Sequence, residues 1–347
     1  DFLYIREGII MHMADALMSP AVGTALWGSS AVAMAYSSKK VQSGLDDNKI
    51  PLMGVMGAFV FAAQMINFTI PMTGSSGHIG GGLLLSIILG PYAAFITMAS
   101  ILAIQALFFA DGGLLALGAN IINLGFFTCF IAYPYIFKPM MKNKFDEKNL
   151  FKASLTASII GLQMGAFAVV LETLISGKTE LPFWNFLLLM QPIHLAIGVV
   201  EGLVTAAVVT FVWKNRPEII SSSFENNRLS GVSIKSVASM IMIMAILTGG
   251  FVSWFASSNP DGLEWSMFKT SGQEELEADG HVYEKSASLQ EKTAVLPDYG
   301  FKNTEGSNIG TSVSGIIGGG ITFVVASALG FGINQYKKKN KTDNKAA

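Results

Sequence analysis

Long apolar stretches recur along this 347-residue chain and constrain its fold more than any other feature. A helix needs about 20 predominantly apolar residues to cross the hydrocarbon core of a bilayer. Hydrophobic residues make up 51% of the chain and charged residues only 14%, whereas about 25% of a soluble chain is charged. The sequence therefore predicts an all-α, polytopic membrane protein.

The hydropathy pattern predicts about seven transmembrane helices and, after a polar boundary at 221–233, two C-terminal ones. The apolar stretch 79–109 is too long for one helix, and Gly90-Pro91 divides it into a short glycine-rich span and a full one. The other spans are expected at about 21–37, 51–68, 118–138, 150–176 and 182–213 (interrupted at Pro192), and then at 233–256 and 308–333.

Basic residues predict the orientation, because loops rich in lysine and arginine stay in the cytoplasm. They fall on one side if 79–109 crosses twice: Lys39-Lys40, the loop 138–148, the linker 214–235 and the lysine tail at the C-terminus. The extracytoplasmic side then receives the segments that carry Met11, His12 and His78. It also receives the mostly acidic loop 257–307, which contains a solvated His281. Gathering of cations by its charge is one interpretation of this loop, and a hydrated tether whose segment 259–265 touches the entrance is favoured.

Several classes of function are excluded. The net charge of -1 gives no signal for binding nucleic acid. One cysteine, Cys129, allows neither an intramolecular disulfide nor a cysteine-based metal cage. The chain contains no GxxxxGK[ST], Ser-His-Asp or HExxH pattern, so we predict that it is not an enzyme and does not itself hydrolyse ATP.

Met11 and His12 predict a metal site if the chain starts at Met11. Residues 1–10 have no signal-peptide pattern, and we interpret them as an upstream extension. A free amine followed by histidine offers three consecutive nitrogens: the amine, the deprotonated amide of His12 and its imidazole. These donors close two fused chelate rings in a nearly planar arrangement that suits nickel(II) or copper(II).

A fourth planar donor must come from elsewhere, and His78 is the candidate. It follows the flexible, glycine-containing stretch PMTGSSG, in which Ser75 and Ser76 are placed to orient its ring. Taken alone, His12 and His78 are each better explained as ordinary near-terminal and helix-entry residues. Their expected position on one face of the membrane favours the metal site.

Other polar residues in or near the spans have simpler explanations. His194 and Glu201 are seven residues apart, on one face of a helix. One interpretation is that they form a proton or ion path. We favour the other interpretation, in which His194 is a buried, hydrogen-bonded histidine and Glu201 holds helices together. Asp111 precedes two glycines and indicates a turn, and Asn120 is expected to form hydrogen bonds between helices.

Four ordered segments resemble the CbiM/NikM family, the substrate-binding (S) components of energy-coupling factor (ECF) transporters for cobalt and nickel. A fifth segment resembles the PDGLE segment of the small CbiN/NikN subunit, so the chain looks like a fusion of a unit at 11–220 with a unit at 230–347. These segments are MHMADALMSPAVG at 11–23, PMTGSSGHIGGGLL at 71–84, FFADGGLLALGANIINLG at 108–125, HLAIGVVEGLVTAAVV at 194–209 and, for the PDGLE segment, NPDGLEW at 259–265.

The resemblance implies a square-planar nitrogen site made of the Met11 amine, the His12 amide and ring, and the His78 ring. It implies Ni²⁺ or Co²⁺ as the transported ion, and the sequence does not choose between them. It also implies two kinds of partner in the cell membrane: a CbiQ/NikQ-like transmembrane scaffold subunit and cytoplasmic CbiO/NikO-like ATPases. The chain departs from the family at Asp15-Ala16, where the family has glycine after the acidic residue, and in carrying residues 1–10.

Two other functions compete with this hypothesis. A proton-coupled secondary metal transporter would use His194 and Glu201, but intramembrane acidic residues are scarce. A membrane-bound metal sensor or scaffold would bind metal without moving it, but the sequence contains no soluble output domain.

Overall fold

A computed structural model describes residues 12–44, 49–142, 144–225, 229, 233–273, 276–302 and 307–346, without the side chains of 43–44 and 337–346. Met11, residues 1–10, Glu274 and Glu275 lie outside the described residues. The helices are α1 (Pro20–Gly44), α2 (Lys49–Gln64), α3 (Gly82–Leu89), α4 (Pro91–Phe108), α5 (Leu117–Ile121), η2 (Ile122–Phe137), α6 (Lys138–Met141), α7 (Glu147–Ile175), α8 (Phe183–Asn215), α9 (Pro217–Phe224), α10 (Lys235–Gly250), α11 (Gly262–Ser271), α12 (His281–Thr293) and α13 (Asn308–Ala346), with short turns η1 (Asp15–Leu17), η3 (Val252–Phe255) and η4 (Pro297–Tyr299).

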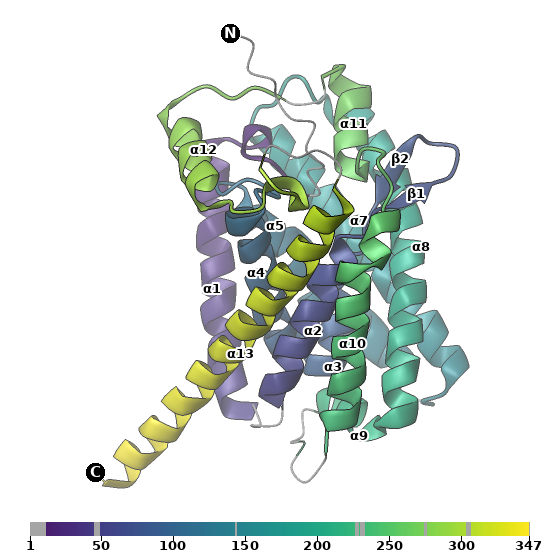
Figure 1. The fold of residues 1–347 in the computed structure, drawn as a ribbon, viewed down its shortest axis with the longest axis vertical. Helices are drawn as coiled ribbons and strands as arrows, with labels where there is room; N and C mark the ends of the chain where they lie inside the picture. The colour runs from purple at the N-terminus through teal and green to yellow at the C-terminus, as the bar shows by residue number, and fades with distance from the viewer. Residues whose placement is uncertain are drawn as a thin grey trace.

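The long helices form one bundle with their axes roughly along the molecule (Figure 1), which confirms the prediction of a helical membrane protein. Among the described residues, five helical segments are long and apolar enough to cross a membrane: α4, the continuous segment α5–η2–α6, α7, α8 and α13. The apolar helices α2 and α10 have 16 residues each. The count of seven spans plus two stays a prediction.

The predicted division of 79–109 is present in the structure. Gly90 has φ 83°, a conformation that favours glycine, and α4 begins at Pro91. The first piece, α3, has only eight helical residues, or about 12 Å of helix. It is too short to cross a hydrocarbon core of about 30 Å by itself. At Pro192 the helix α8 continues without a break through 33 residues, where the sequence predicted an interruption.

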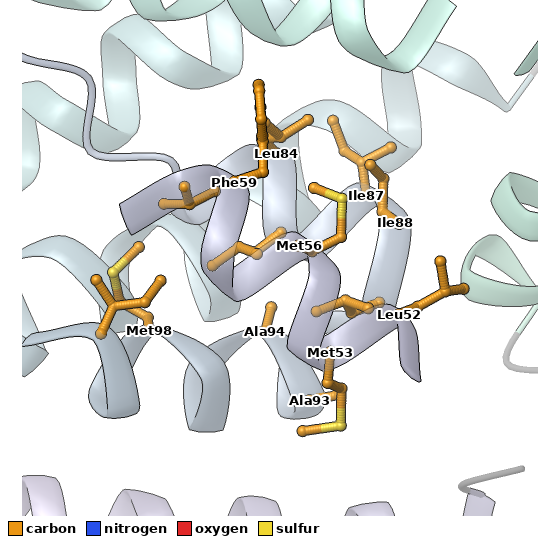
Figure 2. Close-up of a cluster of buried hydrophobic side chains, with 14 of the residues drawn as sticks. Leu52, Met53, Met56, Phe59, Leu84, Ile87, Ile88, Ala93, Ala94 and Met98 are labelled. Atoms are coloured by element: carbon orange, nitrogen blue, oxygen red, sulfur yellow. The ribbon is translucent and has the colours of Figure 1, made fainter. Parts of the chain in front are cut away.

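Helices α2 and α3 lie at the centre of the bundle. Every residue of α3 is buried, as is every residue of α2 except Pro51. A helix that is apolar on all sides must be kept from water, and here the other helices surround it. Figure 2 shows their side chains packed with those of α4. Helices α10 and α13, from the C-terminal part, also pack on α2, so that part is integral to the bundle.

Close helix crossings depend on small residues, as is usual in membrane bundles. Helices α10 and α13 cross at Gly249 and Gly315, where a Cβ on Gly249 would lie 3.1 Å from the backbone of Gly315. Thr322 of α13 and Thr97 of α4 both approach Gly57 of α2 to 3.1 Å from its ideal Cβ position. The sequence of α2 therefore accommodates neighbours on two sides.

The stretch PMTGSSG is an ordered turn of a β-hairpin, whereas the sequence predicted a flexible loop. The strands β1 (Phe68–Ile70) and β2 (Ser75–Gly77) pair antiparallel, with Phe68 opposite Gly77. Gly74, with φ 77°, and Met72, with φ 65°, turn the chain between them. The hairpin, α11 and α12 lie at one end of the bundle, and α9 and the end of α13 at the other (Figure 1).

Two segments that the sequence predicted to be linkers are folded and packed. The first part of the predicted boundary belongs to α9, because Ile219 and Ile220 are buried and Ser223 bonds to the carbonyl of Ile88. The rest of that boundary, residues 226–228 and 230–232, lies outside the described residues. The acidic loop 257–307 contains α11, α12 and η4 and bonds to the first unit at Met18 and Ala106, so it is a folded segment where the sequence predicted a hydrated tether. His281 is exposed, as predicted.

Candidate metal centre

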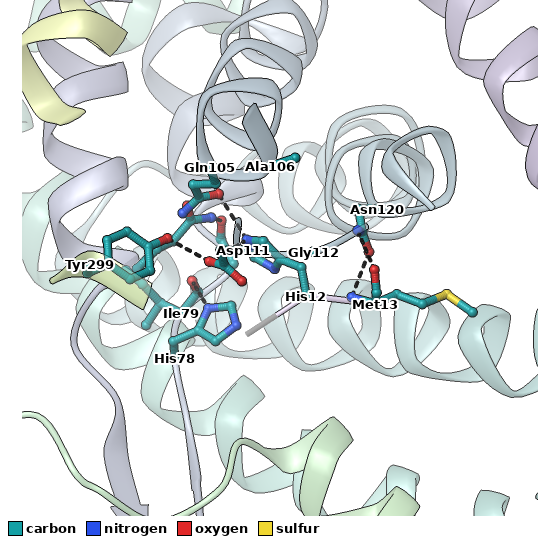
Figure 3. Close-up of polar contacts among 12 residues, drawn as sticks. His12, Met13, His78, Ile79, Gln105, Ala106, Asp111, Gly112, Asn120 and Tyr299 are labelled. Carbon is teal, nitrogen blue, oxygen red and sulfur yellow. Dashed lines mark hydrogen bonds and ion pairs between the residues drawn. The ribbon is translucent and has the colours of Figure 1, made fainter. Parts of the chain in front are cut away.

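The segment before α1 is fastened into the bundle by backbone hydrogen bonds. Asn120 in α5 accepts from the Met13 amide and donates to the Met13 carbonyl, each at 3.1 Å. The amide of Gly113 donates to the same carbonyl at 3.0 Å. Buried backbone groups outside a helix need such partners. Asn120 was expected to join two helices; it instead positions the residue that follows His12 (Figure 3).

The turn 110–113 adapts to this segment. Gly112 has φ 80°, as the Asp-Gly-Gly pattern predicted for a turn. A Cβ on Gly112 would lie 2.8 Å from Cβ of His12 and 3.0 Å from Nδ2 of Asn120. The left-handed backbone and the close approach both require glycine here.

A chain of amide side chains determines the tautomer of His12. The carbonyl of Gly80 can only accept, so Gln64 presents its Nε2 to it, at 2.8 Å. The Oε1 of Gln64 then accepts from Nε2 of Gln105 at 3.0 Å, which leaves Oε1 of Gln105 facing Nε2 of His12 at 2.9 Å. His12 therefore carries its proton on Nε2, and the lone pair of Nδ1 is available to an ion.

His78 has the complementary tautomer. Its Nδ1 lies 3.1 Å from the carbonyl oxygen of Ile79, which can only accept, so the proton is on Nδ1 and the lone pair on Nε2. The ring centres of His12 and His78 are 5.3 Å apart, with an angle of 76° between the planes. Metal–nitrogen bonds of about 2 Å hold two ligand atoms within about 4 Å of each other. Two rings whose centres are 5.3 Å apart are close enough to share one ion.

Both rings line a cavity of about 70 Å³. His12 is 3% exposed and His78 8% exposed, so both rings are buried in the bundle. Among the described residues, no three His, Cys, Asp or Glu side chains are arranged to hold a metal ion. An ion bound between the two imidazoles therefore needs other donors, and backbone nitrogens at Met11 and His12 are the ones that the sequence predicted.

Asp111 does more than form a turn. Its carboxylate is 2% exposed, and its Oδ2 lies 3.8 Å from Nε2 of His12. The hydroxyl of Tyr299 donates to the same oxygen at 2.6 Å. Burial, and then the charge of Asp111, raise the pKa of Tyr299 well above its ordinary value, so the hydroxyl remains a donor at neutral pH.

Glu201 and His194 occupy the places that the favoured interpretation predicted. Both carboxylate oxygens of Glu201 accept backbone bonds, from Gly80 at 2.8 Å and from Gly81 at 3.1 Å. This buried residue holds α8 to the turn before α3. Nδ1 of His194 lies 2.8 Å from the carbonyl of Met190 in its own helix, and the ring borders the cavity. Among the residues that the structure describes, no hydrogen bond joins His194 to Glu201.

The two serines have another role than the one predicted. Ser76 donates to the carbonyl of Asn259 at 2.8 Å, and Ser75 is paired with Thr73 at 2.9 Å. The carbonyl of Ile79 contacts the ring of His78 at Nδ1. The reason is the hairpin, which directs both hydroxyls toward polar groups of the turn and of the PDGLE segment.

The PDGLE segment completes the outer wall of the cavity. Asp261 caps α11: its Oδ2 accepts from the Leu263 amide at 3.3 Å, and Glu264 closes the capping box with the Asp261 amide at 3.1 Å. The other oxygen, Oδ1, has no hydrogen-bond partner among the described residues, and Asp261 is 3% exposed. This carboxylate lines the same cavity as His12, His78 and His194.

Sequence reasoning missed Gln64, Gln105 and Glu172. Each is a buried polar residue inside an apolar helix, a signal that usually marks a functional or structural contact. The first two orient His12. Glu172 of α7 accepts from Asn123 at 2.8 Å and joins α7 to η2.

Solved structures place this bundle among transition-metal transporters. One crystal structure, described as a transition metal transporter, aligns with 64% of this chain and all of its own at a TM-score of 0.54 and 29% identity. A second, described as a truncated transition metal transporter, aligns with 59% of this chain and 99% of its own at a TM-score of 0.53. The fold and the buried histidines thus define an integral membrane protein of the metal-transporter class.

The family is shown by sequence models. The model of the cobalt uptake substrate-specific transmembrane region (CbiM) matches residues 12–219, and the PDGLE domain model matches residues 235–335. The chain belongs to the CbiM family, in a form fused to a CbiN/NikN-like PDGLE domain. A putative fused nickel transport protein of Archaeoglobus fulgidus is 29% identical over 94% of this chain and 99% of its own, and a putative metal transport protein of Haloquadratum walsbyi is 34% identical over 63% and 98%.

Proposed function

We propose that this protein is the substrate-binding membrane subunit of an ECF-type uptake system for nickel or cobalt ions. The ion is held by the α-amine of Met11, the deprotonated amide and Nδ1 of His12, and Nε2 of His78. The observation that carries the proposal is the pair of buried imidazoles, whose ring centres lie 5.3 Å apart on one cavity. Four planar nitrogens favour nickel on geometry, and the family includes cobalt carriers.

The amine donor exists only in a chain whose first residue is Met11. In that chain the outer end of the bundle, with the hairpin, α11 and α12, faces the extracytoplasmic side, and the C-terminus is cytoplasmic. The CbiM-like unit extends over 11–220 and the CbiN/NikN-like unit over 230–347. The close packing of α10 and α13 on α2 supports a function in which both units act as one body.

A nickel titration tests the site. The protein that starts at Met11 is compared with His12→Ala, His78→Ala and a version with one extra N-terminal residue. We expect a yellow, diamagnetic 1:1 nickel complex from the parent and its loss in all three variants. His281→Ala is the matched control, because His281 is exposed on α12 and is expected to leave the complex unchanged. Variants that bind as well as the parent would refute the site.

Energy for transport comes, in this proposal, from separate cytoplasmic ATPases coupled through a transmembrane scaffold subunit. The relatives are transport proteins, and the chain itself is proposed to have no catalytic activity. Reconstitution of the chain alone tests this step against proton coupling. We expect no nickel accumulation on a proton gradient without the ATPases, whereas a secondary carrier would accumulate the ion. Glu201→Gln would then abolish accumulation only in the secondary carrier.

A further inference from the structure

Tyr299 connects the fused C-terminal unit to the buried histidine through one carboxylate oxygen. Its hydroxyl donates to Oδ2 of Asp111 at 2.6 Å, and this same oxygen lies 3.8 Å from Nε2 of His12 (Figure 3). Tyr299 is 7% exposed, although it lies on a loop between α12 and α13. A side chain of the PDGLE domain thus approaches the candidate metal centre with a single residue between them.

The backbone around Tyr299 is held in an unusual conformation. Asp298 and Tyr299 are consecutive non-glycine residues with φ values of 52° and 55°. Such a conformation persists only where the surroundings over-determine it, and it often marks a functional site. The surroundings here are a bond from the Asp298 amide to the Phe109 carbonyl at 2.9 Å and a stacked contact of the Tyr299 and Phe109 rings at 5.0 Å.

The same segment is tied to the first unit at other points. Gln290 donates to the carbonyls of Ala106 at 2.8 Å and of Gly112 at 2.7 Å, and Tyr283 donates to the Met18 carbonyl at 2.7 Å. These three bonds end on backbone groups. Tyr299 differs from Gln290 and Tyr283 because it reaches a side chain that faces His12.

We propose that Tyr299 is a positioning residue of the metal centre, which acts through Asp111 on His12 and makes the PDGLE domain part of the ion-binding site. This inference rests on the proposed function. Gln105 accepts the N–H of His12, and the negative charge of Asp111, 3.8 Å from the same nitrogen, makes the other ring nitrogen a stronger donor to a bound ion. The tyrosine hydroxyl holds that carboxylate in place and replaces water at a buried charge.

Tyr299→Phe tests the inference, because it removes one oxygen and keeps the ring between Phe61 and Phe109. The full chain starting at Met11 is purified, and its nickel affinity is measured by competition with a chelator. We expect affinity to fall by about 10-fold or more, as for other residues that support metal ligands. The ligand-field band of the bound nickel is expected to shift. Tyr283→Phe is the matched control and is expected to change affinity by less than about twofold.

A double-mutant cycle with Asp111→Asn separates positioning from a general loss of stability. If Tyr299 acts through Asp111, adding Tyr299→Phe to Asp111→Asn causes no further loss of affinity. The inference would be overturned if the affinity losses of the two variants simply added in the double variant. It would also be overturned if Tyr299→Phe kept the affinity and the ligand-field band and only lowered the unfolding temperature. The proposed function fails separately: the parent would then not bind nickel, or His12→Ala would bind it as well as the parent. Either result would overturn the proposed function as well as this inference.

Discussion

Replacing Gln105 by methionine tests whether the amide chain beneath His12 sets the tautomer that binds the ion. Methionine has nearly the same length and volume but cannot form the bonds to Nε2 of His12 at 2.9 Å and to Oε1 of Gln64 at 3.0 Å. Two buried polar atoms lose their partners, and each such atom costs about 1–3 kcal/mol. We therefore expect the metal-free protein to lose about 2–6 kcal/mol of stability, and less where the site relaxes.

The effect on the ion has a separate cause. Without the acceptor on Gln105, the proton of His12 is free to move to Nδ1, and the nitrogen proposed to bind the ion is then blocked. Loss of a partner that fixes a ligand's tautomer typically reduces metal affinity about 10- to 100-fold, which is about 1.4–2.8 kcal/mol. Nickel affinity is measured by chelator competition, and stability by thermal unfolding in detergent.

Gln163→Met is the matched control. Gln163 of α7 is a partly buried glutamine in another apolar helix; it donates to the Gln191 carbonyl at 2.8 Å and has no bond to the amide chain of His12. We expect this variant to lose stability and to keep nickel affinity within about twofold of the parent's. An equal loss of affinity in both variants would show that general loosening of the bundle, and not the tautomer of His12, controls binding.

Three further changes give distinct outcomes. Gly112→Ala places a side chain at φ 80° and 2.8 Å from Cβ of His12. We expect thermal unfolding to show a loss of at least about 1–2 kcal/mol in the free energy of unfolding, together with weaker nickel binding. Unchanged binding would show that this turn does not affect the site. Asp261→Asn keeps an oxygen to cap α11 but removes a charge from the cavity wall. We expect nickel association, measured by stopped flow, to slow about 10-fold and the unfolding temperature to stay nearly constant. An unchanged association rate would mean that the ion enters elsewhere. Gly315→Leu forces α10 and α13 apart at Gly249, so we expect thermal unfolding to show a loss of about 1–3 kcal/mol, and equal stability would contradict the observed close crossing.

The elements that the sequence predicted well are those with a strong local signal. The spans at 118–138, 150–176 and 308–333 correspond to helical segments, because a long apolar run in a membrane has few alternatives to a helix. Gly90-Pro91 marked a helix boundary because proline cannot continue the preceding helix. Linker predictions were less reliable, since α9 gains its structure from burial of two isoleucines against other elements.

The site residues also differ in how far the sequence could reveal them. His12 and His78 were noticed because intramembrane histidines are rare, and the structure brings their rings together. Gln64 and Gln105 were missed, although both are polar residues in apolar helices. Their importance comes from hydrogen-bond partners in other helices, and sequence spacing cannot reveal those partners.

The sequence by itself determined the class of the protein, the apolar helices, the histidines of the candidate site and the fusion of two units. Hydropathy and proline act locally, so they can be read from the sequence. Histidines are rare in this chain and stand out against its apolar background. Tertiary structure alone decided that the rings of His12 and His78 meet, that Asp111 faces His12, and that Tyr299 from the far end of the chain reaches Asp111. These are contacts between residues separated by up to 188 positions in the chain, and they exist only once the helices have packed.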